Sequence, residues 1–550
     1  MFLTVDEFGP SDAADEAGLG FWVAACLLLV AALTIPFVMV DVPPVLDYPN
    51  HLAGFYILAH PTDPVISRFY APRWALLPNV GADVLGALLL KVLPVHVAGR
   101  IVLATSLAAP IAGTVIYARA AFGRLTFWSL GSGLAAYNGL FFLGFMNFLI
   151  GLGLALAGAG VWTAARRRGP MQAAAAGAAC STLVYFCHLS ALAFFAILIG
   201  AWETEGLIGS RARQPRQWLT ALAVVAVSLA PAALLYLASP LAGAPGAIAY
   251  RPWLEKLLQL DTPFLTYDLL VSLLTLAAVC LVIGYRGVTL ARGAWLTFAA
   301  LAALYVVTPG WMKGGAFVDT RIPVMAGFLL FAALSPRLSP RAGSVTAAVL
   351  CALLVVRTGQ VAVVWFDHRR DLAQFRDVIG CVPPGAKVIA TYGYGGDPTV
   401  DRPPGGLAVP GLYPVNMHMP ALLVIERHAF WPLLFSDPRQ QPLMVRAPYD
   451  RLAFPLGELF DAHRLADEHP SPTTLVHAPY LPAWRKNFDY VLLLNASQAP
   501  LNATPPTSDL DVIRINQTAA LYAIHRPYAQ GEAGRGNSNL LRGNALHSIQ

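Results

Sequence analysis

Two carboxylates, an amide and an imidazole gather in the stretch "VDVPPVLDYPNHLAGFYILAH" (residues 40–60), which holds Asp41, Asp47, Asn50 and His51. A carboxylate can take a proton from a hydroxyl group, and an amide or an imidazole can hydrogen-bond a polar ligand. Pro49 is compatible with the first turn of a helix, where its missing N–H has no partner to lose. We therefore expect a helix from about residue 50 to 60, with Asp47 kept ionised by the positive end of its dipole.

The expected helix has an apolar stripe of Leu52, Phe55, Tyr56 and Ala59 at helical spacing. A short amphipathic helix that follows an apolar span is typical of a helix lying along the membrane interface. His51 would approach the same face as Asp47. The simpler interpretation is an acid matched to a helix dipole, with His51 in water.

A second group of charges lies in "TPGWMKGGAFVDTRIPV" (residues 308–324), which contains Lys313, Asp319 and Arg321. The guanidinium of Arg321 offers a fork of donors that fits phosphate oxygens. Two simpler roles are an arginine that extends to lipid headgroups, or an Asp319–Arg321 pair that fixes the loop.

Three further polar residues stand among apolar neighbours. Asn138 and Asn147 belong to the hairpin "AAYNGLFFLGFMNFLIG", where two amides could bind hydroxyl groups or cap the helix ends. His188 lies in "YFCHLSAL", where two short spans meet, and an ionisable residue at that depth faces a cavity or the protein interior.

The polar tail holds His418, Glu426 and His428 in "YPVNMHMPALLVIERHAFWP". Their spacing does not fit a zinc-protease helix, and alternating Met and His over one stretch is a weak indication of copper. We interpret this stretch as a folded loop. Only Cys381 of the six cysteines lies in the tail, so the tail has no paired thiolates for a metal.

The composition shows what must position these groups. The chain has 550 residues, of which 57% are hydrophobic and 12% charged, whereas a soluble protein carries roughly a quarter charged residues. Apolar runs long enough to cross a bilayer recur through the first two thirds. The net charge of +6 comes from short basic clusters between these runs, which is a positive-inside pattern and excludes a nucleic-acid surface.

The sequence predicts a polytopic α-helical membrane protein with about 11 spans. These are 21–40, 97–117, 125–140, 144–165, 171–187, 188–203, 218–238, 266–285, 293–308, 322–336 and 342–363. Residues 81–94 are too short and interrupted for a span, so we interpret them as an interfacial or re-entrant helix within an external loop of 41–96.

Arginine clusters set the expected orientation. They lie near residues 119–124, 166–168, 211–216, 286–292 and 337–341, which places these connections and the N-tail (1–20) in the cytoplasm. The chain after the membrane domain (21–363) would then be external. Residues 366–527 predict an α/β domain, with a helix, a strand from about Lys387, and strands at 488–495 and 511–527. The Gly- and Asn-rich tail 528–550 predicts disorder.

The order of several segments resembles the GT-C class of integral-membrane glycosyltransferases, in particular a bacterial group of uncharacterised members. The segments are "DYPNHLAGFYIL", "LPNVGADVLGALLLKVLPVHVAGR", "YNGLFFLGFMNFLIGLGLAL", "FCHLSALAFF" and "FVDTRIPV", over most of residues 40–335. In this class the acid of the first external loop is the catalytic base or a metal ligand. The resemblance gives that role to Asp47, with Asp41 second, and a divalent cation (Mg or Mn) would use Asp47. The external loop 41–96 departs from this pattern, because it has no acid-x-acid pair.

The resemblance implies inverting transfer of a sugar from a polyprenyl-phosphate donor to a lipid, glycan or protein acceptor, at the outer face of a bacterial inner membrane. The expected substrate-binding residues are Arg321, Lys313, His188, His51, Asn50, Asn138 and Asn147. Two alternatives are a lipid or glycan transporter or flippase, and a non-catalytic scaffold. Transporters prefer a site at the membrane midplane, whereas the candidate charges here gather at one face. We expect Asp47, Arg321 and His188 to line one outward-facing cavity.

Overall fold

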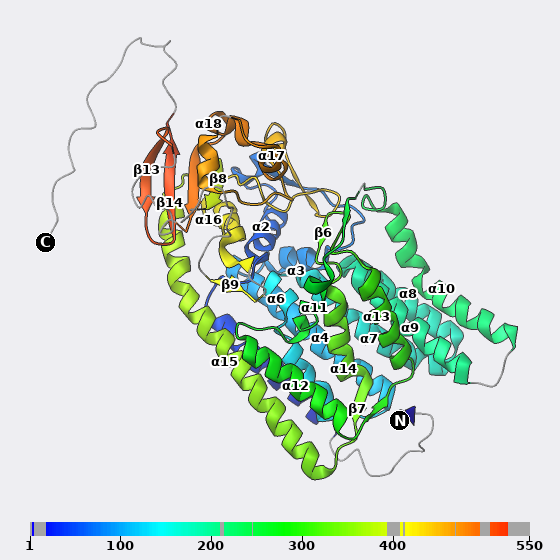
Figure 1. Ribbon diagram of the computed structural model, residues 1–550. Helices are drawn as coiled ribbons and strands as arrows, with labels where there is room; N and C mark the ends of the chain where they lie inside the picture. The colour runs from blue at the N-terminus through cyan, green and yellow to red at the C-terminus, as the bar shows by residue number, and fades with distance from the viewer. Residues whose placement is uncertain are drawn as a thin grey trace, which may run out of the picture.

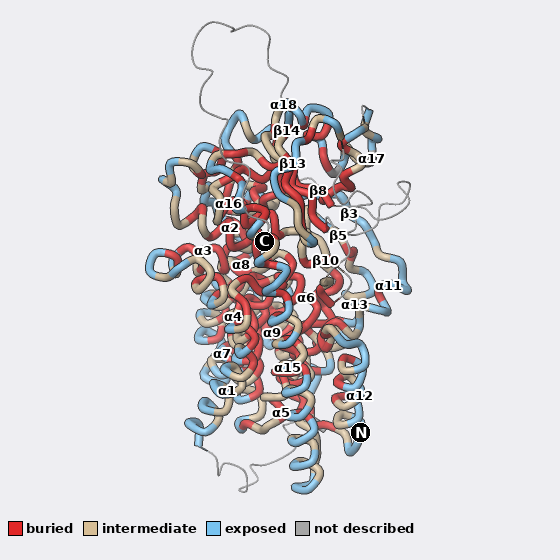
Figure 2. Tube along the Cα trace, turned by 90° about the vertical axis from the view of Figure 1, so that its left-hand side faces the viewer, coloured by how far each residue is buried: buried red, intermediate tan, exposed pale blue. Residues whose placement is uncertain are grey.

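The computed structural model describes residues 3–4, 18–209, 214–244, 246–392, 407–410, 413–467, 469–495 and 507–525. A helical bundle forms one part and a mixed α/β region caps one end of it (Figure 1). Buried residues run along the inside of the bundle and continue into the cap (Figure 2). Most of the expected N-tail (1–20) and all of the tail 528–550 lie outside the described residues.

Five described helices are long and apolar enough to cross a membrane: α4 (Val95–Phe122), α7 (Met146–Arg168), α9 (Leu189–Gly209), α10 (Pro215–Ala238) and α15 (Pro340–Ile379). A sixth candidate joins Trp253–Phe264 to α12 (Leu269–Tyr285) through a bend of 79°. Shorter apolar helices are α1 (Leu19–Leu33), α13 (Ala294–Val307) and α14 (Arg321–Ala333). The prediction of a polytopic helical membrane protein is confirmed, with five or six spans by these criteria among the described residues.

The expected span 125–140 is not one helix. It consists of α5 (Phe127–Leu130), the 3₁₀ helix η4 (Gly131–Ala135) and α6 (Gly139–Leu143). The glycines and the serine at residues 131–133 have low helix propensity. Asn138 then starts a new helix by capping its N-terminus. The glycines have a packing reason, since a Cβ on Gly131 would lie 2.8 Å from the ring of Phe331.

The external loop holds two helices, α2 (Tyr48–Ala59) and α3 (Gly81–Leu89). The expected helix is present in α2, but it does not lie open on the membrane surface. All of its residues except Tyr56 and Ala59 are buried, because α3 and α4 pack against it together with α16 (Leu422–Arg427) and the 3₁₀ helix η6 (Val415–Ala421) of the cap. The apolar stripe therefore belongs to an interface between the two parts. With nine residues, α3 is too short to span a membrane.

The cap contains a four-stranded sheet in the order β13-β14-β12-β8. Strands β8 (Val388–Tyr392) and β12 (Tyr490–Leu494) pair in parallel, while β14 (Ala519–Ile524) is antiparallel to both β12 and β13 (Leu510–Ile515). The expected strands of the tail are thus confirmed. The expected span 342–363 and the helix after it form one helix, α15, which runs along the bundle and reaches the sheet (Figure 1).

Shorter elements connect these parts. β2 (Tyr70–Pro72) of the external loop pairs with β11 (Leu443–Val445) of the cap. The remaining described elements are β1 (Leu3–Thr4), η2 (Ile35–Val38), η3 (Ile66–Arg68), α8 (Pro170–Cys187), β3 (Ile248–Ala249), α11 (Trp253–Leu258), η5 (Thr262–Phe264), β4 (Val288–Leu290), β5 (Trp311–Met312), β6 (Gly315–Ala316), β7 (Leu334–Pro336), β9 (Ala408–Val409), β10 (Tyr413–Pro414), η7 (Tyr449–Leu452), η8 (Ala462–Ala466), α17 (Pro472–His477), η9 (Leu481–Ala483) and α18 (Trp484–Asn487).

Candidate active site

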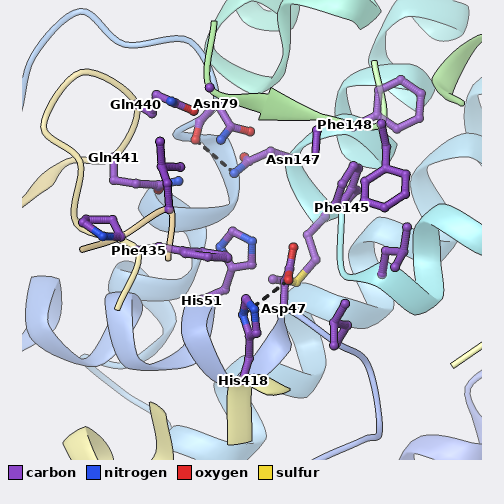
Figure 3. A pocket seen from close by; sticks show the side chains of 18 of the residues that line it. Asp47, His51, Asn79, Phe145, Asn147, Phe148, His418, Phe435, Gln440 and Gln441 are labelled. Atoms are coloured by element: carbon purple, nitrogen blue, oxygen red, sulfur yellow. Dashed lines mark hydrogen bonds and ion pairs between the residues drawn. The ribbon is translucent and has the colours of Figure 1, made fainter. Parts of the chain in front are cut away.

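A cavity of about 290 Å³ lies where the bundle meets the cap. From the bundle and the external loop, its polar lining comprises Asp47, His51, Asn79, Asn147, His188 and Arg321; the cap contributes Tyr413, His418, Gln440, Gln441 and Glu458. Figure 3 shows Asp47 between His418 and the phenyl ring of Phe145. The expectation that Asp47, Arg321 and His188 line one cavity is confirmed.

Asp47 is held in place by the turn between α6 and α7. Its backbone N–H donates to the carbonyl of Leu143 at 3.1 Å, and a Cβ on Gly144, which has a φ of +90°, would lie 2.9 Å from the Asp47 Cβ. The turn therefore needs the glycine, both for its left-handed backbone and for its close approach.

The Asp47 carboxyl stands at the N-cap of α2 but makes no capping hydrogen bond to that helix. Only 15% of its side chain is exposed, and burial raises the pKa of Asp47 to about 8. The expectation of an ionised carboxylate at the water boundary is therefore wrong, since loss of hydration outweighs the helix dipole here.

His418 is the neighbour of Asp47 that the sequence analysis missed. Its Nδ1 lies 3.4 Å from Asp47 Oδ1 and comes from η6 of the cap. Burial lowers the pKa of His418 to about 4, with a smaller contribution from His51. The ring therefore stays neutral near neutral pH, and its neighbour Asp47 is the group that titrates.

His51 lines the same cavity and is not wet. Its ring packs edge-on against Phe435 at 5.6 Å and stacks near Phe55 at 6.3 Å. Burial lowers the pKa of His51 to about 4, so it too is neutral. His51 can exchange hydrogen bonds with a ligand but offers no charge.

Arg321 brings unused donors to the cavity. Its Nη2 donates to the carbonyl of Ala316 at 3.0 Å, and its Nη1 reaches Ser190 Oγ only at 3.5 Å. Its Nε has no hydrogen-bond partner among the described residues. The guanidinium carbon lies 5.3 Å from the centre of the Phe145 ring. Buried donors without partners are costly, so this side chain is suited to a ligand that accepts from it.

The alternative of an Asp319–Arg321 pair is not what the structure contains. Asp319 is completely buried and pairs with Arg251, whose Nε lies 3.4 Å from its carboxylate. Asp319 also accepts from the backbone N–H of Thr320 at 3.0 Å. Asp319 and Arg251 therefore hold the loop, and Arg321 is left to face the cavity.

His188 and Asn147 complete the membrane side of the cavity. His188 Nδ1 accepts from the N–H of Ser190 at 3.0 Å, so its proton is on Nε2. Asn147 accepts from the N–H of Ala82 at 2.7 Å and donates to the carbonyl of Asn79 at 3.0 Å. Asn147 thus fixes the start of α3 at the cavity wall, with its hydrogen bonds already engaged.

Asn138 and Lys313 do not line the cavity. The Asn138 carbonyl accepts from two N–H groups of α6, and its amide donates to the carbonyls of Ala135 and Ala136. This is the capping role that the sequence left open. Lys313 donates to the hydroxyl of Tyr236 at 3.2 Å and to the carbonyl of Ala242 at 3.0 Å, which ties its loop to the end of α10.

Asn50 and Asp41 serve contacts between the two parts of the molecule. Asn50 is buried behind Asp47 and hydrogen-bonds Leu433, Phe435 and His418 of the cap. Asp41 lies outside the cavity and pairs with Arg376 of α15 at 2.8 Å. Asp41, the second candidate for the catalytic base, is therefore not beside Asp47.

A divalent cation held by the protein alone would need several ligating side chains around Asp47, whereas Mg²⁺ is also bound by one or two carboxylates together with substrate phosphates. Within the described residues, no three His, Cys, Asp or Glu side chains gather as a metal site would require. The described residues around Asp47 therefore do not form a metal site by themselves, and the proposed reaction uses no cation.

The sequence matches no protein-family model and no curated protein. Among solved structures, the fold resembles ArnT from Cupriavidus metallidurans. In the apo state the TM-score is 0.50 at 12% identity, over 92% of this chain and 98% of ArnT. The same protein bound to undecaprenyl phosphate gives a TM-score of 0.49 at 12% identity, with the same coverage. At this identity the likeness concerns the fold, and no residue role transfers with it. The chain thus has an ArnT-like fold.

Proposed function

We propose that the chain is a membrane glycosyltransferase that moves a sugar from a polyprenyl-phosphate carrier to an acceptor hydroxyl at the extracytoplasmic face. One observation carries the proposal: a single cavity brings the carboxyl of Asp47 together with the unsatisfied guanidinium of Arg321. These are the two groups that such a transfer needs, a base and a cation for phosphate.

The proposed reaction is a direct displacement. Asp47, once deprotonated, takes the proton of the acceptor hydroxyl as its oxygen bonds to the anomeric carbon. The bond from that carbon to the phosphate oxygen breaks, and the phosphate leaves on the lipid with its negative charge. Arg321 stabilises that charge through the donors it does not spend on the protein. Because attack and departure occur on opposite sides, the configuration at the anomeric carbon inverts.

The cavity suits a lipid-linked donor. It lies at the end of the bundle, beside elements that contain apolar and aromatic groups, among them Trp311, Phe317 and Phe148. A polyprenyl chain could stay in the bilayer while its phosphate reaches Arg321. We also propose the finer topology: eleven passes, a cytoplasmic N-terminus and an external cap, which would put the cavity on the outer side.

A transporter or flippase is the second candidate, but no specific observation favours it. The charged lining belongs to the junction with the cap, whereas alternating access favours a site near the midplane between repeats. A scaffold would have no need for a buried acid and an incompletely hydrogen-bonded guanidinium in the lining of one cavity, because both cost stability.

The test is genetic. A deletion strain of the source organism is complemented with the wild type, Asp47→Asn or Asp41→Asn, and its glycolipids and glycans are profiled. We expect the deletion and Asp47→Asn to lose the same glycosylated product, and Asp41→Asn, whose carboxylate lies outside the cavity, to retain it. Unchanged profiles in the deletion strain, or full complementation by Asp47→Asn, would refute the proposal.

A further inference from the structure

His418 is joined to the external loop by two groups on α2. Its Nδ1 lies 3.2 Å from the amide nitrogen of Asn50 and 3.4 Å from Asp47 Oδ1. In Figure 3 the His418 ring points at the Asp47 carboxyl from the cap. Both neighbours therefore compete for one ring nitrogen, which can either accept or donate a hydrogen bond but not both.

The orientation of Asn50 decides that competition. Its Oδ1 accepts from the backbone N–H of Phe435 at 2.7 Å, and its Nδ2 donates to the carbonyl of Leu433 at 3.3 Å. Neither contact survives if the amide is turned over. The nitrogen that faces His418 is thus a donor, and Nδ1 must accept from it. The ring proton is then on Nε2, and Nδ1 presents a lone pair to Asp47.

A lone pair beside a carboxyl favours its protonated form, because a carboxylic acid can donate to it and a carboxylate is repelled by it. A proton on Nδ1 would have the opposite effect. The remaining titratable groups on the cavity wall are His51, His188, Arg321, Tyr413 and Glu458. No ion pair joins any of these groups to Asp47 among the described residues, where His418 is its ion-pair neighbour.

We propose that His418 is a positioning residue whose tautomer sets the protonation of Asp47, so that the docked cap decides when this carboxyl can act as a base. This inference rests on the proposed function only for its catalytic consequence. When Asp47 releases its proton to solvent or to a ligand, the His418 proton leaves Nε2 and one binds at Nδ1, which then donates to the carboxylate and gives up the hydrogen bond that it accepts from Asn50. Protons and charge balance without a further reactant.

Burial acts in the same direction, since it raises the pKa of Asp47 and lowers that of His418. A second histidine–aspartate contact also joins the cap to the external loop. His428 of the cap has its Nδ1 at 3.4 Å from Asp63 of the loop, and its Nε2 faces the hydroxyl of Tyr56 at 3.3 Å. Although burial raises it, the pKa of Asp63 is lowered overall by N–H donors of Ile66 and Val65.

Solid-state NMR of the full-length protein in lipid bilayers, labelled with ¹⁵N-histidine, tests the inference without any substrate. The His418 signals are those lost in His418→Gln, with His418→Asn as a second variant if the first does not fold. At about pH 6 we expect Nε2–H at His418, and above about pH 8 a switch to Nδ1–H. Asp47→Asn should abolish the switch. Nδ1–H at His418 at low pH, or one tautomer across the range, would overturn the inference.

An activity measurement separates the two proposals. In the wild type, the rate of transfer from a polyprenyl-phosphate sugar should rise with pH. His418→Gln should move this rising limb of the pH–rate profile by about one pH unit, while His428→Gln should leave it in place. Transfer by the wild type with an unmoved limb in His418→Gln overturns the role of His418 and leaves the proposed function standing. The tautomer switch without transfer under any condition supports the role of His418 and counts against the proposed function.

Discussion

Replacing Arg321 with methionine should weaken the binding of undecaprenyl phosphate and leave the fold intact. Arg321 is 8% exposed. Its Nε has no hydrogen-bond partner within the described part of the chain, and one of the two hydrogen bonds that its side chain makes there is long at 3.5 Å. A hydrogen bond to a charged group contributes about 1.5–3 kcal/mol, and each 1.4 kcal/mol is about a tenfold change in affinity. The dissociation constant should therefore rise between about tenfold and a hundredfold.

The assay is titration of purified protein in lipid nanodiscs with undecaprenyl phosphate, read by native mass spectrometry. Lys313→Met is the matched control, since it removes a cation of the same loop whose ammonium binds Tyr236 and Ala242 outside the cavity. It should lower the melting temperature and leave the affinity unchanged. Equal affinity in Arg321→Met and wild type, or equal losses in the two variants, would refute a phosphate site at Arg321.

Three further predictions concern Asp47, the hairpin and the junction with the cap. Because burial raises the pKa of Asp47 to about 8, the carboxyl is mainly protonated below that pH. The transfer rate should therefore rise about tenfold per pH unit from about pH 6 to 7 and level off above pH 8. A transfer rate independent of pH over this range would contradict the role of Asp47 as the base. Asn138→Ala should destabilise the protein by about 1–2 kcal/mol, seen in thermal unfolding, without changing the affinity for undecaprenyl phosphate; a loss of affinity at unchanged stability would instead indicate a binding role. Arg376→Met breaks the 2.8 Å ion pairs to Asp41 and Glu426. The free energy of unfolding should fall by only about 1 kcal/mol, because these groups are partly exposed. A drop several times larger would show that the ion pairs of Arg376 anchor the cap.

Much of the architecture could be predicted from local patterns. Apolar runs of spanning length identified the membrane class, and short apolar stretches near turn residues located β8, β12 and β14. The convergence of Asp47, Arg321 and His188 on one cavity followed from placing each at the same end of a span. These features depend on hydrophobicity and chain direction, which the sequence carries directly.

The electrostatics of the site could not be predicted in this way. The helix-dipole argument treats the start of α2 as an open end, but the cap covers it, and desolvation then dominates. His418 is 368 residues from Asn50, and no spacing or motif in its own stretch indicates the loop that it meets. A partner brought in by tertiary packing leaves no local signal. The broken segment 125–140 was missed because it holds no charged residue, while its shape depends on Asn138 and on close packing at Gly131.

The most direct test of the central claim is transfer by the purified protein in nanodiscs. Undecaprenyl-phosphate-linked hexoses and pentoses, each with a labelled sugar, are supplied together with lipids extracted from the source organism, and labelled product is measured for the wild type and Asp47→Asn. We expect product with the wild type and a rate at least about a hundredfold lower with Asp47→Asn, at unchanged binding of undecaprenyl phosphate. Transfer by Asp47→Asn at the wild-type rate would contradict this expectation.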